Sequence, residues 1–254
     1  MHVRPKKSLG QHFLTDHNIA EKIVSALPDA PAILLEIGPG TGILTKYILE
    51  KQGIKPLFIE TDREAVEYLK YTFPEIGDGL IHEDFLKLDL KTLVHDNYQI
   101  VGNLPYNISS QIFFRMLDER ERVMSAVVMI QKEVAERIRT GPGSKVYGIL
   151  SVLLQTWFDI EYLFTVSEKV FIPPPKVKSA VIRLSRNKTV DIGCDPDFYF
   201  TIVKAGFNQR RKTLRNALKP FLADKDTSEI EDLLPKRAEQ LSVDEFIELT
   251  THLE

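Results

Sequence analysis

The chain has 254 residues and a formal net charge of −3, with 43% hydrophobic and 27% charged residues, which excludes collagen-like, mucin-like and wholly disordered proteins. The single cysteine, Cys194, cannot form an intrachain disulfide or build a zinc site, so we expect a reducing compartment and no metal. No apolar run approaches the roughly 18 residues of a membrane span, and no signal peptide is recognisable, so we expect a cytoplasmic protein without a membrane partner.

Short apolar runs alternate with amphipathic stretches over residues 1–186. Ser109 is a candidate N-cap for the helix whose stripe is Ile108, Ile112 and Met116, and Asp62 is a candidate N-cap for a helix through residue 71. The other predicted helices are 43–51, 132–139 and 147–156, and the predicted strands are 32–37, 56–60, 79–82, 98–101, 123–130, 160–166 and 179–184. This alternation predicts an α/β fold with a Rossmann-like, doubly wound parallel sheet.

The pattern changes after residue 186. Residues 187–196 are polar and rich in turn formers, and the remainder is predicted to be helical, so we divide the chain into domains 1–186 and 187–254. Residues 201–223 hold six basic residues and no acid, whereas residues 224–254 hold ten acids against three bases. Residues 169–188 form a second basic run without an acid. Such runs can be solvated helix surfaces, but unbroken single-sign runs favour contact with a polyanion.

A glycine loop follows the first predicted strand in Glu36-Ile37-Gly38-Pro39-Gly40-Thr41-Gly42. In an open parallel sheet this is where ligands bind, because glycines let the backbone approach the ligand and the next helix offers free amides. The alternative is a plain strand–helix turn. The spacing G-x-G-x-G does not match the dinucleotide pattern G-x-G-x-x-G, which disfavours a nicotinamide oxidoreductase.

Two carboxylates follow the next two predicted strands. Glu60 is placed to accept hydrogen bonds from both hydroxyls of a ribose, and Asp84 to accept one from an adenine amino group while Phe85 packs on the ring. Each carboxylate alone is more typical of a solvated loop. Together, at successive strand ends, they predict contacts to an adenosine-containing cofactor.

The segment Asn103-Leu104-Pro105-Tyr106 follows the fourth predicted strand. An asparagine carbonyl and a neighbouring backbone carbonyl can accept both N–H groups of an adenine amine and aim its lone pair at an electrophilic methyl group. The proline fixes the loop, and the tyrosine can stack on a base turned out of its strand. The alternative for a strand-terminal Asn-x-Pro is an ordinary turn.

Five segments together resemble the ribosomal RNA adenine dimethyltransferases, in order along the chain from residue 7 to residue 216. They are KSLGQHFL at 7–14, LEIGPGTG at 35–42, NLPYNISS at 103–110, VFIPPPKV at 170–177 and FNQRRKTLRN at 207–216. The chain is most similar to the branch that dimethylates two adjacent adenosines in the 3'-terminal hairpin of 16S rRNA. His12 departs from this pattern, because many members have asparagine there.

The resemblance implies S-adenosylmethionine as the cofactor and assigns a role to each matching residue. The cofactor would lie over Gly38 and Gly40, with its ribose on Glu60, its adenine beside Asp84, and its methionine end against His12, Leu14 and Asn103. The target adenine would lie between Tyr106 and Phe171, with its amine held by Asn103 and the carbonyl of Leu104, in a loop fixed by Pro105.

The basic residues gain a role from the same resemblance. A helix at 208–219 would contact RNA phosphates through Arg210, Arg211, Lys212 and Arg215, with Arg4, Lys6 and Lys7 adding to that surface. The alternative is a structural role, in which these bases pair with acids of the C-terminal segment, near Glu229, Glu231 and Asp232, and serve only stability. The partner implied is 16S rRNA within a pre-30S particle, and we expect a monomer.

Three functional alternatives remain from sequence. A large-subunit (23S) adenine methyltransferase of the antibiotic-resistance type shares the loop chemistry. A DNA adenine methyltransferase is disfavoured, because those enzymes commonly carry Asp or Asn, Pro, Pro, Tyr at this loop. A ribosome-assembly factor that binds RNA without turnover is disfavoured by the intact Asn103 and Tyr106.

Overall fold

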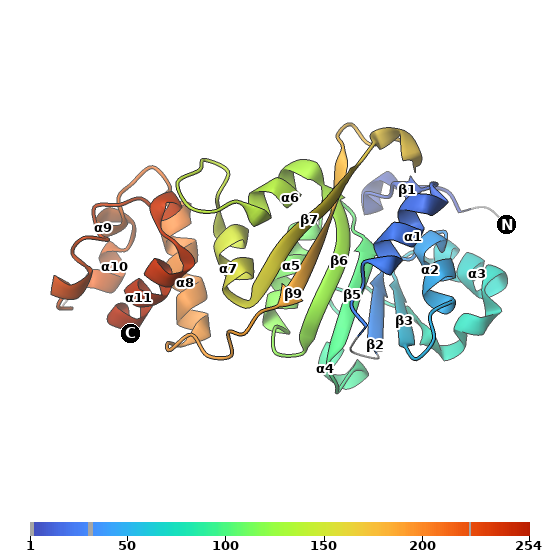
Figure 1. Ribbon diagram of the computed structural model, residues 1–254, viewed down its shortest axis with the longest axis horizontal. Helices are drawn as coiled ribbons and strands as arrows, with labels where there is room; N and C mark the ends of the chain where they lie inside the picture. The colour runs from blue at the N-terminus through green and yellow to red at the C-terminus, as the bar shows by residue number, and fades with distance from the viewer. Residues whose placement is uncertain (1–2, 30–32, 224) are drawn as a thin grey trace. The chain divides into compact units, whose positions relative to one another are not determined.

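A seven-stranded sheet organises the first part of the chain in this computed structural model, which describes residues 3–29, 33–223 and 225–254 (Figure 1). The strand order is β4-β3-β2-β5-β6-β9-β7. The strands are β2 (Ile33–Ile37), β3 (Lys55–Glu60), β4 (Leu80–His82), β5 (Tyr98–Asn103), β6 (Val123–Gln131), β7 (Phe158–Val166) and β9 (Ser179–Arg186). Every predicted strand is present, but residue 32 of the first lies outside the described residues.

The sheet is mixed rather than wholly parallel. Parallel pairing joins β4, β3, β2, β5 and β6, whereas β9 pairs with β6 in the antiparallel direction. The predicted doubly wound parallel sheet is confirmed for these five strands. The antiparallel β9 follows because the chain returns from β7 to β9 through a short connection instead of a helical crossover. From β2 the chain moves outward to β3 and β4, then crosses to β5 on the other side of β2, so the switch point lies between β2 and β5.

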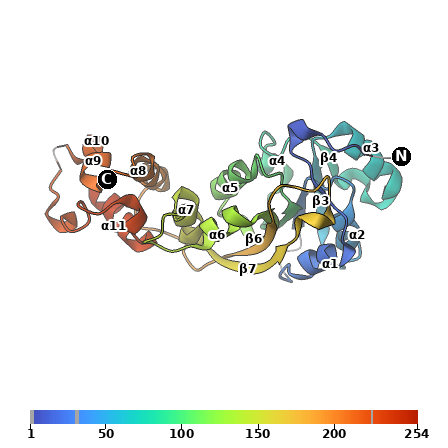
Figure 2. The same ribbon diagram turned by 90° about the horizontal axis from the view of Figure 1, so that it is seen from above.

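Helices cover both faces of the sheet. Figure 2 shows α1 and α2 on one face and α5 on the opposite face. The helices of this region are α1 (His17–Ser25), α2 (Ile43–Leu49), α3 (Arg63–Thr72), α4 (Leu90–Leu93), α5 (Ser109–Asp118), α6 (Lys132–Arg139) and α7 (Ile149–Trp157). Because the central strands are buried on both faces, their residues Leu35, Ile100 and Val127 are fully buried.

Local capping explains where two of these helices begin. The Asp62 side chain accepts a hydrogen bond from the Glu64 backbone N–H at 3.0 Å, which confirms the predicted cap of α3. The prediction of Ser109 as an N-cap is wrong, because Ile108 precedes α5 and Ser109 is its first helical residue. The Ser109 hydroxyl instead donates to the Tyr106 carbonyl at 3.3 Å.

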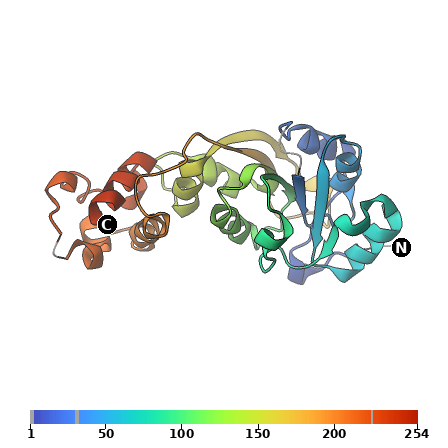
Figure 3. The same ribbon diagram turned by 90° about the horizontal axis from the view of Figure 1, so that it is seen from below.

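Backbone contacts divide the chain into two compact units, one formed by residues 1–135 with 160–186 and the other by residues 136–159 with 187–254. One boundary coincides with the predicted division after residue 186, while residues 136–159 group with the helical unit. The second unit contains α7 together with α8 (Pro196–Asn208), α9 (Leu214–Ala217), α10 (Lys219–Leu222) and α11 (Val243–Leu253). Figure 3 shows α8 and α11 side by side, and their rings Phe207 and Phe246 stack with centroids 5.8 Å apart.

The basic segment at 208–219 is not one helix. The chain leaves α8 at Asn208, passes through a turn and enters the four-residue helix α9 at Leu214, so the predicted continuous helix is wrong. Leu214 is buried and packs closely on Gly206 of α8. A Cβ atom at Gly206 would lie only 3.3 Å from the Leu214 Cδ2 atom. Packing of the apolar residue therefore outweighs the helical propensity of the charged ones around it.

No helix among the residues that the structure describes combines the length and the apolar character of a membrane span. The described residues also hold no group of three histidine, cysteine, aspartate or glutamate side chains arranged to bind a metal ion.

Candidate active site

A cavity opens at the carboxyl ends of β2, β3, β4 and β5, next to the switch point. It is lined by residues 8–13, 59–61, 83–86 and 103–108, together with Ile37, Gly38 and Gly40. The structure thus brings together ten residues singled out from the sequence, which are His12, Gly38, Gly40, Glu60, Asp84, Phe85, Asn103, Leu104, Pro105 and Tyr106. Apart from residues 8–13, the lining comes from four strand ends, because parallel strands that run in one direction all end at the same edge of the sheet.

The glycine loop leaves room for a ligand at this edge. Gly38 and Gly40 have φ angles of 66° and 57°, which side-chain-bearing residues rarely adopt. A Cβ atom on Gly38 would meet nothing within 4 Å, whereas one on Gly40 would lie 2.9 Å from the Phe13 ring. Gly38 therefore faces open space in the cavity, and Gly40 lets the N-terminal segment pack closely on the loop.

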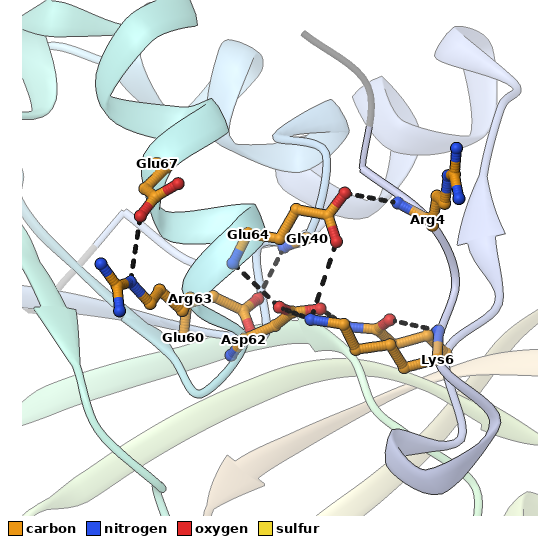
Figure 4. Close-up of polar contacts among 9 residues, drawn as sticks. Arg4, Lys6, Gly40, Glu60, Asp62, Arg63, Glu64 and Glu67 are labelled. Atoms are coloured by element: carbon orange, nitrogen blue, oxygen red, sulfur yellow. Dashed lines mark hydrogen bonds and ion pairs between the residues drawn. The ribbon is translucent and has the colours of Figure 1, made fainter.

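Glu60 is held by backbone N–H groups on both of its oxygens (Figure 4). Its Oε2 atom accepts from the Gly40 N–H at 2.9 Å, and its Oε1 atom accepts from the Asp62 N–H at 2.7 Å. The side chain is 3% exposed, and burial raises the pKa of Glu60 although these backbone hydrogen bonds oppose the rise. Since a carboxylate oxygen accepts more than one hydrogen bond, the group can still receive a ligand hydroxyl.

The N-terminal segment is fixed to this edge through Asp62. Lys6 donates to one Asp62 oxygen and also lies 3.8 Å from Glu64 (Figure 4). Gln11 donates to the other Asp62 oxygen at 3.1 Å. Burial would raise the pKa of Asp62, but the hydrogen bonds from Lys6 and Gln11 outweigh burial and lower it. Lys6 is thus ion-paired within the protein, while 41% of its side chain remains exposed.

Asp84 lines the cavity two residues after the end of β4. Its Oδ1 atom accepts from the Leu86 N–H at 3.0 Å, and its Oδ2 atom lies 4.0 Å from Lys87 Nζ. The neighbouring Phe85 is buried and also lines the cavity. An adenine-sized ring here would meet an apolar face beside a carboxylate.

The amide of Asn103 is oriented by the protein itself. Its Nδ2 atom donates to the His12 carbonyl at 2.9 Å, and the His12 Nδ1 atom donates to the Pro173 carbonyl at 2.7 Å. The next residue, Leu104, donates its backbone N–H to the Met129 carbonyl at 3.0 Å. Because the donor side of the Asn103 amide is used, the acceptor Oδ1 is the side left for an incoming amine.

Two predicted residues do not line the cavity. Leu14 and Phe171 pair between the short antiparallel strands β1 (Phe13–Leu14) and β8 (Phe171–Ile172). Both side chains belong to the hydrophobic core, and Phe171 is 2% exposed. Because alternate side chains of a strand point to opposite sides, Phe13 lines the cavity while Leu14 does not. Phe13 is a site residue that sequence reasoning missed.

Glu36 is a second missed residue and the most strongly perturbed acid of this region. It is fully buried at the end of β2 and accepts a hydrogen bond from the Thr45 hydroxyl at 2.7 Å. Burial raises its pKa from 4.5 to about 8, against the hydrogen bond from Thr45. The glycine loop thus starts from a carboxyl group that binds a proton near neutral pH.

This perturbation predicts a pH dependence of stability. Between pH 4.5 and about 8 the folded state holds a proton on Glu36 that the unfolded chain has released, so the contribution of this group to stability falls as pH rises. We expect Tm to fall less between pH 5 and pH 8 in Glu36→Gln than in the wild type, as measured by calorimetry. Parallel Tm profiles for the two proteins would contradict the assignment.

The four predicted RNA-binding residues of the second unit fall into two kinds. Arg210 pairs with Glu239 at 2.5 Å and Arg215 with Glu231 at 3.2 Å, which places these two in internal ion pairs. Arg211 and Lys212 are exposed in the turn after α8, and neither has an ion-pair partner in the described part of the chain. The turn therefore projects two cations whose charge no acid of the described residues neutralises.

Comparison with known proteins places this architecture in a family. A family model described as "Ribosomal RNA adenine dimethylase" matches residues 3–254. Proteins named "Ribosomal RNA small subunit methyltransferase A" from Parabacteroides distasonis and Cytophaga hutchinsonii are 54% and 53% identical, covering 98% and 99% of this chain and 93% and 98% of their own.

Solved structures agree in fold. A dimethyladenosine transferase from Plasmodium falciparum superposes with a TM-score of 0.78 at 26% identity, covering 94% of this chain and 96% of that one. The 23S rRNA methyltransferase ErmE superposes with a TM-score of 0.70 at 22% identity, over 95% and 99% of the two chains, and this likeness concerns the fold.

Proposed function

This chain belongs to the ribosomal RNA adenine dimethylase family, and on that premise we propose that it transfers methyl groups from S-adenosylmethionine to the exocyclic amines of two adjacent adenosines in the 3'-terminal hairpin of 16S rRNA. The observation that carries the proposal is the oriented Asn103 amide, whose nitrogen is bound by the His12 carbonyl and whose oxygen remains as an acceptor beside the cavity. An acceptor fixed in this way holds an amine rather than deprotonating it.

The residues of the cavity fit S-adenosylmethionine. Gly38 faces open space, Glu60 presents a buried carboxylate at the end of the next strand, and Asp84 with Phe85 offers a polar and an apolar contact further along the edge. These are the three kinds of contact that an adenosyl group with an extended amino acid requires. When bound, the cofactor supplies an electrophilic methyl group on a sulfonium, which is a good leaving group.

The protein's own part in the reaction is orientation. Asn103 Oδ1 and the Leu104 carbonyl would accept the two N–H bonds of the adenine amine, which turns the nitrogen lone pair toward the methyl group. The face of Tyr106 would stack on the base and keep it in the cavity. Held in this way by Asn103 and Leu104, the amine would accept the methyl group that the bound cofactor supplies and would then release one proton.

The named relatives favour the small-subunit rRNA over the large-subunit rRNA as substrate. The two relatives described above carry the small-subunit name at more than half identity, whereas the likeness to the 23S enzyme concerns the fold. Our proposal includes action on 16S rRNA within a pre-30S particle, as a monomer in the cytoplasm, with a role in small-subunit maturation. The intact Asn103 and Tyr106 favour turnover over binding alone.

The direct test is mass spectrometry of 16S rRNA from a strain that lacks the gene for this chain. We expect two dimethyladenosines to be missing from the 3'-terminal hairpin and to return when the wild-type gene is restored. Fully methylated rRNA in the deletion strain would refute the proposed substrate.

Substitution of Arg211 and Lys212 together by Gln should weaken RNA binding without changing stability. The logarithm of RNA affinity falls as the logarithm of salt concentration rises, and each lost phosphate contact is expected to make this slope shallower by about 0.7 to 0.9. Filter binding at several salt concentrations measures this slope, and calorimetry measures Tm. A matched control is Lys22→Gln with Lys70→Gln, which removes two exposed cations from helices α1 and α3.

The ion-paired residues serve as the contrasting case. Arg210 and Arg215 contact Glu239 and Glu231, so their replacement should lower Tm. Because both pairs are partly exposed, the loss in free energy of unfolding should be no more than about 1 kcal/mol for each pair. An unchanged salt slope in the Arg211/Lys212 variant would eliminate the turn as a phosphate-binding element.

A further inference from the structure

The antiparallel direction of β9 brings its first residue to the edge where the cavity lies. In register, Asn103 at the end of β5 lies beside Met129 of β6, and Ser179 of β9 lies beside Gln131 of β6. A strand running the other way would have placed Ser179 at the opposite edge of the sheet. The β6 residue beside Ser179, Gln131, is therefore only two positions from the β6 residue beside Asn103, Met129.

The Ser179 hydroxyl is bonded to the Tyr106 hydroxyl. Ser179 is completely buried, and a buried hydroxyl is destabilising unless it has a hydrogen-bond partner. Burial raises the pKa of Tyr106 although the bond to Ser179 opposes the rise, so the phenol stays protonated at neutral pH and can hold this bond. The two residues are 73 positions apart in sequence and meet only through the strand pairing.

Two further contacts hold the same tyrosine. Its ring stacks on the His12 imidazole with centroids 5.5 Å apart and planes inclined by 30°, and His12 is itself bound to the Pro173 carbonyl. The Tyr106 carbonyl accepts from Ser109, the first residue of α5. The ring is thus fixed by its hydroxyl, by one neighbouring ring and by its own backbone.

We propose that Ser179 is a positioning residue for methyl transfer, because its hydroxyl sets the angle at which the Tyr106 ring meets the target adenine. This inference rests on the proposed function. Stacking alone leaves the ring free to slide and tilt, whereas a bond at the phenol oxygen removes that freedom before the base arrives. A base held at the wrong angle would present its amine away from Asn103, and small misplacements of reacting groups slow reactions strongly.

Replacement Ser179→Ala is expected to lower kcat about 10- to 100-fold on unmethylated small-subunit particles. The Kd for S-adenosylmethionine should stay within about twofold, because Ser179 does not line the cavity. A matched control is Ser125→Ala, which also removes a buried sheet hydroxyl, here bonded to Gln99 at 3.2 Å near the amino ends of β5 and β6. The control should lower Tm comparably and leave kcat close to that of the wild type.

A double-mutant cycle with Tyr106→Phe separates positioning from a general structural effect. If Ser179 acts through the phenol oxygen, adding Ser179→Ala to Tyr106→Phe should cause no further loss of kcat, and the Tm changes should be less than additive because the double variant leaves no orphaned hydroxyl. Wild-type turnover by Ser179→Ala, or an undiminished effect in the Tyr106→Phe background, would overturn the proposal. A wild type that methylates no rRNA would refute the proposed function instead, and the Tm cycle would still decide whether the two hydroxyls are coupled.

Discussion

Replacement of Asn103 by Ala is expected to lower kcat for methyl transfer by about 10²- to 10³-fold or more while the Kd for S-adenosylmethionine changes by less than roughly tenfold. The amide oxygen orients the attacking amine, and this contact matters most in the transition state. Single-turnover transfer to unmethylated small-subunit particles measures the first quantity, and calorimetric titration measures the second.

A second variant at the same position distinguishes the acceptor from its support. Asn103→Asp keeps an acceptor oxygen but loses the Nδ2 donor to the His12 carbonyl, so its carboxylate should be poorly oriented and its kcat intermediate. Near-normal turnover by Asn103→Ala would remove this loop from the mechanism.

Replacement of Glu60 by Ala is expected to raise the Kd for S-adenosylmethionine by about 10- to 150-fold, equivalent to about 1.5–3 kcal/mol for a charge-assisted acceptor. The change also leaves the Gly40 and Asp62 N–H groups without their acceptor, so the glycine loop should loosen. Calorimetric titration measures the affinity, and Tm measures the structural part of the loss.

Glu60→Gln serves as the control for that experiment. Its amide oxygen can serve one of the two backbone donors, so it should lose less affinity than Glu60→Ala. Unchanged binding by both variants would show that the ribose is held elsewhere.

Strand ends were predictable because each carries a local signal. An apolar run followed by Gly38, by Glu60 or by Asn103 marks the end of a strand, and a mostly parallel sheet places such ends together. The cavity could therefore be anticipated from the sequence, including most of its lining.

Contacts between segments that are distant in the chain have no comparable local pattern in the sequence. The Lys6–Asp62 pair, the β1–β8 pairing that buries Phe171, and the Tyr106–Ser179 bond all join residues more than 50 positions apart. The basic segment at 208–219 looked helical because its charged residues tolerate a helix, but the burial of Leu214 decides its conformation. Side-chain direction and ion pairing depend on tertiary packing, which one sequence does not display.

The wall of the cavity formed by residues 8–13 has a consequence for synthesis on the ribosome. That wall is secured by Asp62, by Asn103, and finally by β8 and Pro173, which a ribosome adds more than 150 residues after the wall itself. At a translation rate of about 5–20 residues per second, β8 is synthesised many seconds after the N-terminal segment with which it pairs. A nascent chain that ends just before residue 171 therefore carries every segment that lines the cavity but lacks the β1–β8 pairing and the Pro173 contact that hold the N-terminal wall, so we expect methyl transfer to begin only after these last partners are made.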